Sequence, residues 1–225
     1  MSEQKILVII PAYNAAPTLL TFLPDLLQYW PQQQILLIND GSTDTTSEVA
    51  SSFGITSISH PKNHGKGEAL KTGFRYAIHN GYDAVLTLDA DGQHDPSLIA
   101  SFLSARRPAQ ADVVIGSRMT NPHSMPFLRW CSNTITSKIV SWRAGCRIPD
   151  SQSGYRLIGR DVLTSLPLTT SHYQTESEIL IRAGRAGFRI VDTPIPVRYA
   201  GEPSFIRPFR DIGNFIALIV KSLFW

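Results

Sequence analysis

Two aspartates follow an apolar segment near the middle of the chain. Asp89 and Asp91 come at and just beyond the end of the apolar run 84–88, and alternation along an extended chain directs both to the same side. Two carboxylates aimed at one point are typical of a Mg²⁺ or Mn²⁺ site in phosphate chemistry, where substrate oxygens complete the coordination. A cation would also offset the cost of burying two acids together. We therefore interpret Asp89 and Asp91 as metal ligands, against the simpler interpretation of a solvated turn.

Asp95, a little further along the chain, has a different expected role. It stands before Pro96, and an aspartate in that position is typical of a helix N-cap with proline at the first helical residue. We therefore expect Asp95 to cap a helix rather than to bind a metal.

Lys66 lies in a glycine-rich turn, between Gly65 and Gly67. The spacing excludes a P-loop, which has four residues between its glycines and a serine or threonine after the lysine. A glycine-rich turn that opens a helix can still receive a phosphate or shape a ribose pocket.

Asp40 follows another apolar run and precedes Gly41 and Ser42. Its carboxylate could accept hydrogen bonds from a base or a ribose hydroxyl, or it could form an Asx turn that caps the next helix. The spacing alone leaves both roles open.

Hydrolytic and zinc chemistry have little support in the sequence. No two of the six histidines lie at ligand spacing within a predicted helix, and no GxSxG motif accompanies them. Ser153, in the segment SQSGYR, has no evident base and is expected to donate a hydrogen bond rather than to act as a nucleophile. Cys131 and Cys146 form no CxxC motif, which argues against a disulfide framework or a structural zinc.

These residues are positioned by apolar runs that alternate with helical patterns. The patterns predict strands over 6–10, 35–38, 55–58, 84–88 and 113–115, with helices over 18–29, 44–53, 68–79 and 96–105 between or after them. Such repetition predicts an α/β fold with a mostly parallel sheet covered by helices on both faces. Ligands bind beyond the carboxyl ends of the strands in such sheets, where the polar motifs of the first half of the chain lie.

The second half of the chain has fewer regular patterns. It predicts helices over 127–144 and 175–186 and a strand over 188–191, with no linker before them. We therefore expect one domain over residues 1–210. In residues 211–225 large apolar side chains fall at helical spacing, after Arg207 and Arg210, so this tail is expected to form an amphipathic helix. It would lie in a membrane interface, or dock on the core or on a partner; periodicity leaves these alternatives open.

Composition and charge narrow the classes of function. The chain has 225 residues, 43% of them hydrophobic and 17% charged, so it folds. It has no apolar run of the length that spans a membrane and no secretory leader, so a cytoplasmic location is expected. Residues 113–225 hold fourteen basic and seven acidic residues, and most of the arginines. Arginine suits phosphate, but these arginines are scattered and lack the interleaved aromatics of a nucleic-acid surface.

Several motifs, read in order, resemble a family-2 glycosyltransferase of the dolichyl-phosphate mannosyltransferase type. They are VIIPAYN, INDGSTDTT, HGKGEALKTGF, LDADGQHDP, GSR, DSQSGYR, TESEILIRAGRAGFRI and TPIPVRYAGEPS. The resemblance covers residues 5 to 211. It implies a GT-A fold and inverting transfer of a sugar from a nucleotide donor, such as GDP-mannose or a UDP-sugar, to the phosphate of a membrane polyprenol.

The resemblance also implies a role for each matching residue. The nucleotide pocket would be lined by Pro11, Ala12, Tyr13 and Asn14, with Asp40 at the base and Lys66 near the nucleotide. The metal, Mg²⁺ or Mn²⁺, would be bound by Asp89, Asp91 and Gln93. Acceptor or donor phosphates would be received by Arg118, Arg129, Ser153 and Arg156, and Glu178 would help to shape the sugar and acceptor side.

The residues leave three interpretations of the acceptor and the activity open. A phosphate acceptor is already largely ionised and needs no strong general base. A glycan or other hydroxyl acceptor would need a positioned carboxylate, for which Asp150 and Glu176 are the candidates. A nucleotide-binding subunit without turnover is the third. The chain departs from larger relatives in lacking transmembrane helices, and from polymer synthases in lacking QxxRW. A lipid acceptor would then be reached through the tail helix, the basic half or a membrane partner, peripherally at the cytoplasmic face.

Overall fold

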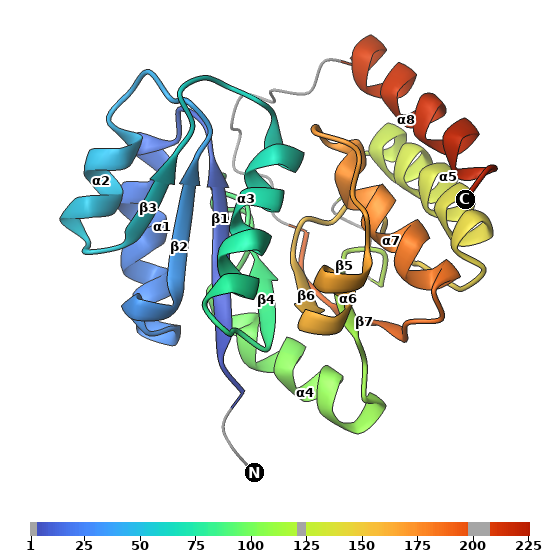
Figure 1. Cartoon of the computed structure of the whole chain (residues 1–225), viewed down its shortest axis with the longest axis horizontal. Coiled ribbons are helices and arrows are strands. Elements are labelled where there is room, and N and C mark those ends of the chain that lie inside the picture. The colour runs from blue at the N-terminus through green and yellow to red at the C-terminus, as the bar shows by residue number, and fades with distance from the viewer. Residues whose placement is uncertain (1–3, 121–124, 198–207) are drawn as a thin grey trace.

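A seven-stranded sheet forms the centre of the protein (Figure 1). The computed structural model describes residues 4–120, 125–197 and 208–225; Arg207 and residues 198–204 of the last motif lie outside them. The strand order is β3-β2-β1-β4-β6-β5-β7. The strands are β1 (Ile6–Ala12), β2 (Ile35–Asn39), β3 (Thr56–Ser59), β4 (Ala84–Thr87), β5 (Val113–Ser117), β6 (Arg156–Gly159) and β7 (Ile190–Pro194).

All strand pairs are parallel except the two that β6 makes, with β4 and with β5. The apolar alternation therefore predicted the α/β class and the mostly parallel sheet correctly. It did not predict β6, because this strand begins with Arg156 and only Leu157 and Ile158 form its apolar run. β7 begins two residues later than expected, since Gly187 has a φ of +82° and turns the chain before it.

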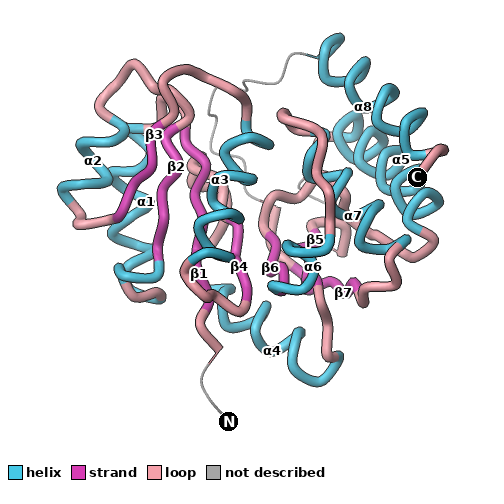
Figure 2. Tube along the Cα trace, in the orientation of Figure 1, coloured by secondary structure: helices cyan, strands magenta, loops and turns pink. Residues whose placement is uncertain are grey.

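Helices cover both faces of the sheet (Figure 2). One face carries α1 (Ala16–Tyr29), α2 (Thr46–Ser52) and α4 (Ile99–Ala109). The other carries α3 (Lys66–His79), α5 (Phe127–Ala144), α6 (Arg160–Ser165), α7 (Gln174–Arg185) and α8 (Pro208–Ser222). Two short 3₁₀ helices, η1 (Gln32–Gln34) and η2 (Pro96–Leu98), precede β2 and α4. β1 contributes alternate residues to the two cores, which is the pattern of a strand buried on both faces.

The helix ends refine two predictions about polar residues. Asp95 accepts a hydrogen bond from the Ser97 backbone at 3.0 Å, with Pro96 at the first helical position, so the predicted N-cap is confirmed. α3 begins at Lys66, two residues earlier than predicted, after Gly65 at a φ of +96°. Gly65 therefore supplies a left-handed turn that L side chains rarely adopt, and Lys66 stands in the first turn of a helix.

The tail forms α8, which begins at Pro208 rather than at residue 211. One side of it is docked, because Leu218 and Ser222 are buried. Arg143 of α5 donates to Ser222 Oγ at 2.9 Å, and the Arg182 guanidinium lies 3.6 Å from the Trp225 ring centre. No helix among the described residues has the length and apolar character needed to cross a membrane.

Candidate active site

The predicted nucleotide-pocket residues lie where β1 and β2 end side by side. Ala12 pairs with Asn39 at the last register position of the two strands. Pro11 and Ala12 are buried, and Tyr13 is half-buried in the following loop. Asn14 has a φ of +50°, a conformation that asparagine tolerates better than most residues. Its Oδ1 accepts a hydrogen bond from the Thr43 backbone at 2.8 Å, so Asn14 joins the two loops that follow these strands.

Asp40 is buried beneath this rim. Its Oδ1 lies 2.7 Å from His60 Nδ1 and accepts from the His64 backbone at 3.0 Å, and its Oδ2 accepts from the Gly65 backbone at 2.7 Å. Only 3% of the residue is exposed. This geometry does not support the predicted contact between Asp40 and a base. Asp40 instead holds the glycine-rich turn against the end of β2, a third role that the spacing did not reveal.

Asp89 and Lys66 form the centre of the candidate site. Lys66 Nζ lies 2.5 Å from Asp89 Oδ1 and 3.1 Å from Glu176 Oε1 of α7. Burial would raise the pKa of Asp89, but the positive charge of Lys66 and its hydrogen bond lower that pKa to about 2. Burial would likewise lower the pKa of Lys66, but Asp89 and Glu176 raise it above its usual range. Both side chains are therefore charged at neutral pH.

Asp91 and His94 complete the loop after β4. Burial, together with the negative charge of Asp89, raises the pKa of Asp91 above its usual range. The Gln93 backbone donates to Asp91 Oδ1 at 3.0 Å. His94 Nδ1 accepts from the Asp89 backbone at 3.0 Å, and burial lowers the pKa of His94. The loop thus presents two neighbouring carboxylates, Asp89 and Asp91. Lys66 lies between Asp89 and Glu176.

This donor set fits a divalent cation that is bound together with a substrate phosphate. Among the described residues, no group of three or more His, Cys, Asp or Glu side chains is arranged to hold a metal ion by itself. Mg²⁺ and Mn²⁺ in phosphate-transfer sites need only one or two carboxylates, because substrate oxygens and water supply the other ligands. A cation bound between Asp89 and Asp91 would offset the burial and the repulsion from Asp89 that raise the pKa of Asp91.

The SQSGYR segment closes one side of the site. A Cβ at Gly154 would lie 2.6 Å from Asp89 Oδ2 and 2.9 Å from Lys66 Nζ, so a larger residue there would displace one of these side chains. Ser153 is buried, and its Oγ has no hydrogen-bond partner among the residues that the structure describes. Thr87 Oγ1 donates to the Gly154 carbonyl at 2.6 Å, which fixes the segment to the end of β4.

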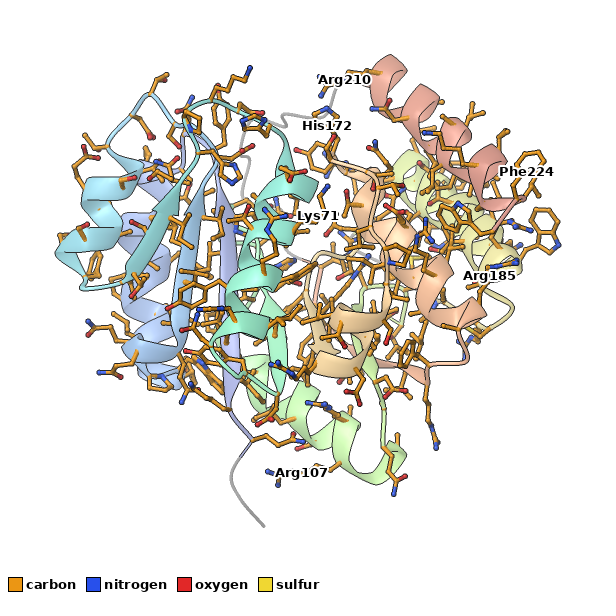
Figure 3. All side chains as sticks on the ribbon, viewed as in Figure 1. Lys71, Arg107, His172, Arg185, Arg210 and Phe224 are labelled. Atoms are coloured by element: carbon orange, nitrogen blue, oxygen red, sulfur yellow. The ribbon has the colours of Figure 1, made fainter. Side chains whose placement is uncertain are left out.

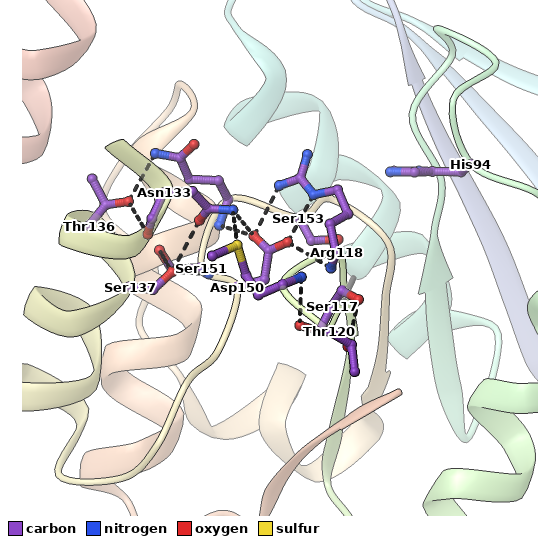
Figure 4. A network of polar contacts seen from close by, with 12 residues as sticks. His94, Ser117, Arg118, Thr120, Asn133, Thr136, Ser137, Asp150, Ser151 and Ser153 are labelled. Carbon is purple, nitrogen blue, oxygen red and sulfur yellow. Dashed lines mark hydrogen bonds and ion pairs between the residues drawn. The ribbon is translucent and has the colours of Figure 1, made fainter. Parts of the chain in front are cut away.

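Arg118 follows β5 and is held by a buried carboxylate (Figure 4). Its Nε and Nη2 donate to the two oxygens of Asp150 at 2.8 and 3.0 Å, and Asn133 Nδ2 donates to the same carboxylate at 2.9 Å. Burial would raise the pKa of Asp150, but these hydrogen bonds and the Arg118 charge lower it. Asp150 is completely buried, so it is not a candidate base for a hydroxyl acceptor.

Three other predicted positions differ in their surroundings. Arg156 is buried, and its guanidinium donates to the carbonyls of Ser151, Ser153 and Glu176. Glu178 is buried too, and it accepts hydrogen bonds from the 169–170 backbone and from Arg182 Nε. These geometries do not support the predicted phosphate contact of Arg156 or the acceptor role of Glu178. Both side chains instead bind protein groups and stabilise the segments around the site. Arg129 lies exposed in the first turn of α5.

Comparison with known proteins assigns the chain to a family. The family model described as Glycosyl transferase family 2 matches residues 7–166. The chain belongs to this family. It is therefore a glycosyltransferase, and the resemblance drawn from its motifs is confirmed.

Two relatives of this glycosyltransferase are named for transfer to a lipid phosphate. The UDP-N-acetylglucosamine–dolichyl-phosphate N-acetylglucosaminyltransferase of Methanococcus voltae is 31% identical, over 88% of this chain and 88% of the relative. The undecaprenyl-phosphate mannosyltransferase of Micrococcus luteus is 30% identical, over 85% of this chain and 82% of the relative.

A solved structure supports the fold. The glucosyl-3-phosphoglycerate synthase of Mycobacterium tuberculosis, crystallised with Mn²⁺, UDP and phosphoglyceric acid, has a TM-score of 0.73 at 23% identity, covering 99% of this chain and 78% of that one. At this identity the likeness bears on the fold alone, and the predicted GT-A architecture agrees with it.

Three residues of the glycosyltransferase site were not assigned this place from the sequence. Glu176 was considered only as a base, whereas it pairs with Lys66; His94 was dismissed with the other histidines; and Gly154 was not singled out. His94 could have been found from its position in the same loop as Asp89 and Asp91. The Glu176 contact spans over a hundred residues of sequence, so no local pattern reveals it.

Proposed function

We propose that this glycosyltransferase catalyses metal-dependent, inverting transfer of a sugar from a nucleotide-sugar donor to a polyprenyl phosphate. The donor, GDP-mannose or a UDP-sugar, would bind over the ends of β1 and β2, against Pro11, Ala12, Tyr13 and Asn14. Lys66 would lie near its diphosphate. Asp89 and Asp91, with Gln93, would hold Mg²⁺ or Mn²⁺, and the bound ion would supply positive charge to the departing diphosphate.

Arg118 is the residue that we expect to meet the acceptor phosphate. A quarter of its side chain is exposed while two of its nitrogens are held by Asp150, so its orientation is fixed before substrate arrives. Such preorganised charge stabilises a transition state without reorganisation during the reaction. Arg129, exposed on α5, and Ser153, whose Oγ has no hydrogen-bond partner in the described part of the chain, are secondary candidates for phosphate contacts.

The chemistry requires no proton transfer at the nucleophile. A phosphate oxygen of the acceptor would attack the anomeric carbon from the side opposite the nucleotide, and the electron pair of the breaking bond would remain on the diphosphate. A phosphate is largely ionised at neutral pH because its second pKa is about 6. A hydroxyl acceptor would need a base instead, and Asp150 is enclosed while Glu176 is paired with Lys66.

The observation that carries the lipid acceptor is an apolar surface on α5 and α8. Among the described residues, ten of the twelve exposed large hydrophobic side chains lie on these helices or just beyond α8. We call this set the apolar face: Phe127, Leu128, Trp130, Ile135, Trp142, Ile212, Ile216, Val220, Leu223 and Phe224. The two helices lie side by side, joined by Arg143 and Ser222 (Figure 1).

The composition of the apolar face favours a membrane interface over a protein core. Exposed basic residues accompany it, Lys138 on α5 and Arg210 and Lys221 on α8, and α5 contains no acidic residue. Arg210 and Phe224 mark the two ends of α8 in Figure 3. Aromatic and aliphatic side chains flanked by lysine and arginine are typical of helices that lie in the interface of an anionic bilayer. We therefore propose peripheral association with a membrane through this face.

Sugar transfer from a panel of nucleotide sugars to a short polyprenyl phosphate tests the reaction. Each donor is offered with Mg²⁺, with Mn²⁺ and with a chelator, and the lipid product is analysed by mass spectrometry. We expect a glycosyl phosphate lipid from one donor, formed only with the divalent ion. Donor hydrolysis without any lipid product would overturn the acceptor assignment, and equal transfer in chelator would overturn the metal requirement.

Vesicle sedimentation tests the membrane face separately. We expect the protein to sediment with vesicles that contain phosphatidylglycerol and to be released by high salt. Trp142→Glu and Ile216→Glu should each weaken binding about tenfold, whereas Leu20→Glu, at a similarly exposed leucine on α1, should not. Equal binding by all of these variants, or association of free protein into dimers that the same substitutions abolish, would overturn the membrane assignment.

A further inference from the structure

Lys66 lies between two carboxylates that come from different parts of the chain. Its Nζ is 2.5 Å from Asp89 Oδ1, after β4, and 3.1 Å from Glu176 Oε1, in the first turn of α7. The Lys66 and Glu176 side chains are each at most 17% exposed, so they face the site rather than solvent, and Asp89 is 24% exposed. Lys66 thus forms ion pairs with two acidic side chains.

The surrounding backbone confines Lys66 to this position. α3 starts at Lys66, so its side chain leaves from a fixed helical turn. Gly154 lies on one side, where a Cβ would come within 2.9 Å of Nζ. A Cβ at Gly67 would collide with Thr175 Oγ1 at 1.9 Å, so the first turns of α3 and α7 are in close contact there. Lys66 Nζ is therefore held within reach of both Asp89 and Glu176.

We propose that Lys66 is an exchangeable counterion of the metal site. It neutralises Asp89 while no divalent cation is present, and it transfers to Glu176 when a cation takes its place on Asp89. Glu176 is then a positioning residue that keeps the displaced lysine at the site, close to the expected diphosphate. This inference rests on the proposed metal role of Asp89 and Asp91.

The exchange makes a quantitative prediction about metal affinity. A divalent ion arriving alone must displace Lys66 from Asp89 and remain close to its positive charge, which opposes binding. A nucleotide diphosphate offers Lys66 a further anionic partner, so nucleotide and metal should favour each other's binding, and reciprocally. A lysine that served only to bind the nucleotide would leave the affinity for metal alone unchanged.

Direct measurement of Mn²⁺ binding tests the exchange without any turnover. Free Mn²⁺ is followed by electron paramagnetic resonance in titrations of the full chain, first without nucleotide and then with UDP or GDP. Lys66→Gln should bind Mn²⁺ alone about tenfold more tightly than the wild type, because the competing charge is gone. The gain in Mn²⁺ affinity caused by the nucleotide should shrink in this variant.

Substitution of Glu176 gives a second, independent test of the exchange. Glu176→Gln should weaken Mn²⁺ binding about tenfold, since Lys66 then has only Asp89 as its carboxylate partner. In the Lys66→Gln background the same substitution should have a much smaller effect, which a double-mutant cycle measures. If Lys66→Gln does not fold, comparison of Glu176→Gln with Lys66→Arg, which keeps the charge and should bind Mn²⁺ as the wild type does, still tests the proposal.

Lys71 provides the matched control. It also lies on α3 and pairs with an acid, Glu68, at 2.7 Å, so Lys71→Gln should leave Mn²⁺ affinity unchanged. Unchanged or weakened Mn²⁺ binding by Lys66→Gln, with a wild type that binds the ion, would overturn this inference alone. Failure of wild type and variant to bind Mn²⁺ even with nucleotide would overturn the metal step of the proposed function as well.

Discussion

Asp89 and Asp150 both pair with a basic side chain at the candidate site, but their surroundings are opposite. Asp150 is fully buried, and its oxygens accept hydrogen bonds from the backbone and guanidinium of Arg118, from Asn133 and from the Gln152 backbone. Asp89 keeps 24% of its side chain exposed, and its shortest ion pair is with Lys66. A carboxylate has about four acceptor positions, so Asp150 is saturated by the protein while Asp89 retains capacity for an external ligand.

The difference distinguishes a carboxylate that holds a neighbouring side chain in place from one that can bind an ion or a substrate. The saturated pair fixes Arg118 in one orientation, so that its exposed edge is ready for a phosphate. The open pair holds charge that can be redistributed when a cation and a diphosphate arrive. Both pairs are charged and partly or wholly buried, so charge and burial alone do not distinguish a reactive carboxylate from a bracing one. The number of hydrogen-bond donors that the protein supplies to each carboxylate does distinguish them.

The largest effect is expected at the open carboxylates. Asp91→Asn removes the charge but keeps the shape of a side chain whose Oδ1 accepts a hydrogen bond from the Gln93 backbone. We expect kcat/KM for lipid glycosylation to fall about 10³-fold, because charge stabilisation of the leaving diphosphate is lost. The midpoint of thermal unfolding should change little. Asp95→Asn, at the N-cap of η2, is the control and should keep near wild-type activity; a loss of less than tenfold in Asp91→Asn would contradict the metal role.

The next effect is on stability and belongs to the saturated carboxylate. Asp150→Ala leaves Arg118 and Asn133 without their acceptor in a closed space, and removal of one partner of a buried pair is strongly destabilising. We expect the free energy of unfolding to fall by about 3 kcal/mol, measured by urea denaturation. Asp89→Ala should cost less than half as much, since solvent reaches that side chain. Equal losses of stability in the two variants would remove the distinction between the pairs.

A smaller effect is expected when the open pair is crowded rather than removed. Gly154→Ala would bring a Cβ within 3 Å of both Asp89 and Lys66, so one of them must shift. We expect activity to fall about tenfold to a hundredfold and stability by about 1–2 kcal/mol. Gly145→Ala is a spatial control, because no atom lies within 4 Å of its added Cβ, although its φ of +72° carries a strain of its own. Full activity in Gly154→Ala would show that the pair tolerates displacement.

The sequence predicted the rim of the sheet well because the apolar pattern of each strand ends where a polar motif begins. β1, β2 and β4 end at Ala12, Asn39 and Thr87, and the motifs PAYN, NDGSTD and DADGQHDP lie at or just beyond these ends, as predicted for one rim of a parallel sheet. The contact between Lys66 and Asp89 was not predicted. The helical spacing of α5 also gave its bounds, 127–144, without error.

What could not be predicted depends on contacts between distant segments. Arg156 was expected to meet a phosphate because the family resemblance implied it, yet the guanidinium donates to three backbone carbonyls. Asp40 was likewise expected to contact a nucleotide base, but its oxygens accept hydrogen bonds from the backbone of residues 64–65. Residue type states what a side chain can bind; only the fold decides whether protein groups already occupy it. The same limit hid β6, whose place between two strands comes from pairing rather than from its own short apolar run.

The smallest effect is a dependence of stability on pH that should appear at Asp150. Burial would raise its pKa, but hydrogen bonds and the charge of Arg118 lower it below the usual value, so protonation costs more in the folded than in the unfolded protein. The resulting stabilisation is present above the unfolded pKa of about 4 and is lost as the pH falls through the folded value. The difference in unfolding free energy between wild type and Asp150→Asn should therefore be largest near neutral pH and should narrow below about pH 4.

Urea denaturation of both proteins from pH 7 to pH 3 measures this narrowing, with and without Mn²⁺. Added Mn²⁺ should leave the difference unchanged, because the oxygens of Asp150 are occupied by Arg118, Asn133 and Gln152. A difference that stayed constant over this range would mean that Asp150 acts through packing rather than through its charge. A difference that changed with Mn²⁺ would mean that the ion reaches Asp150 too, and the contrast between an open and a saturated carboxylate would then fail.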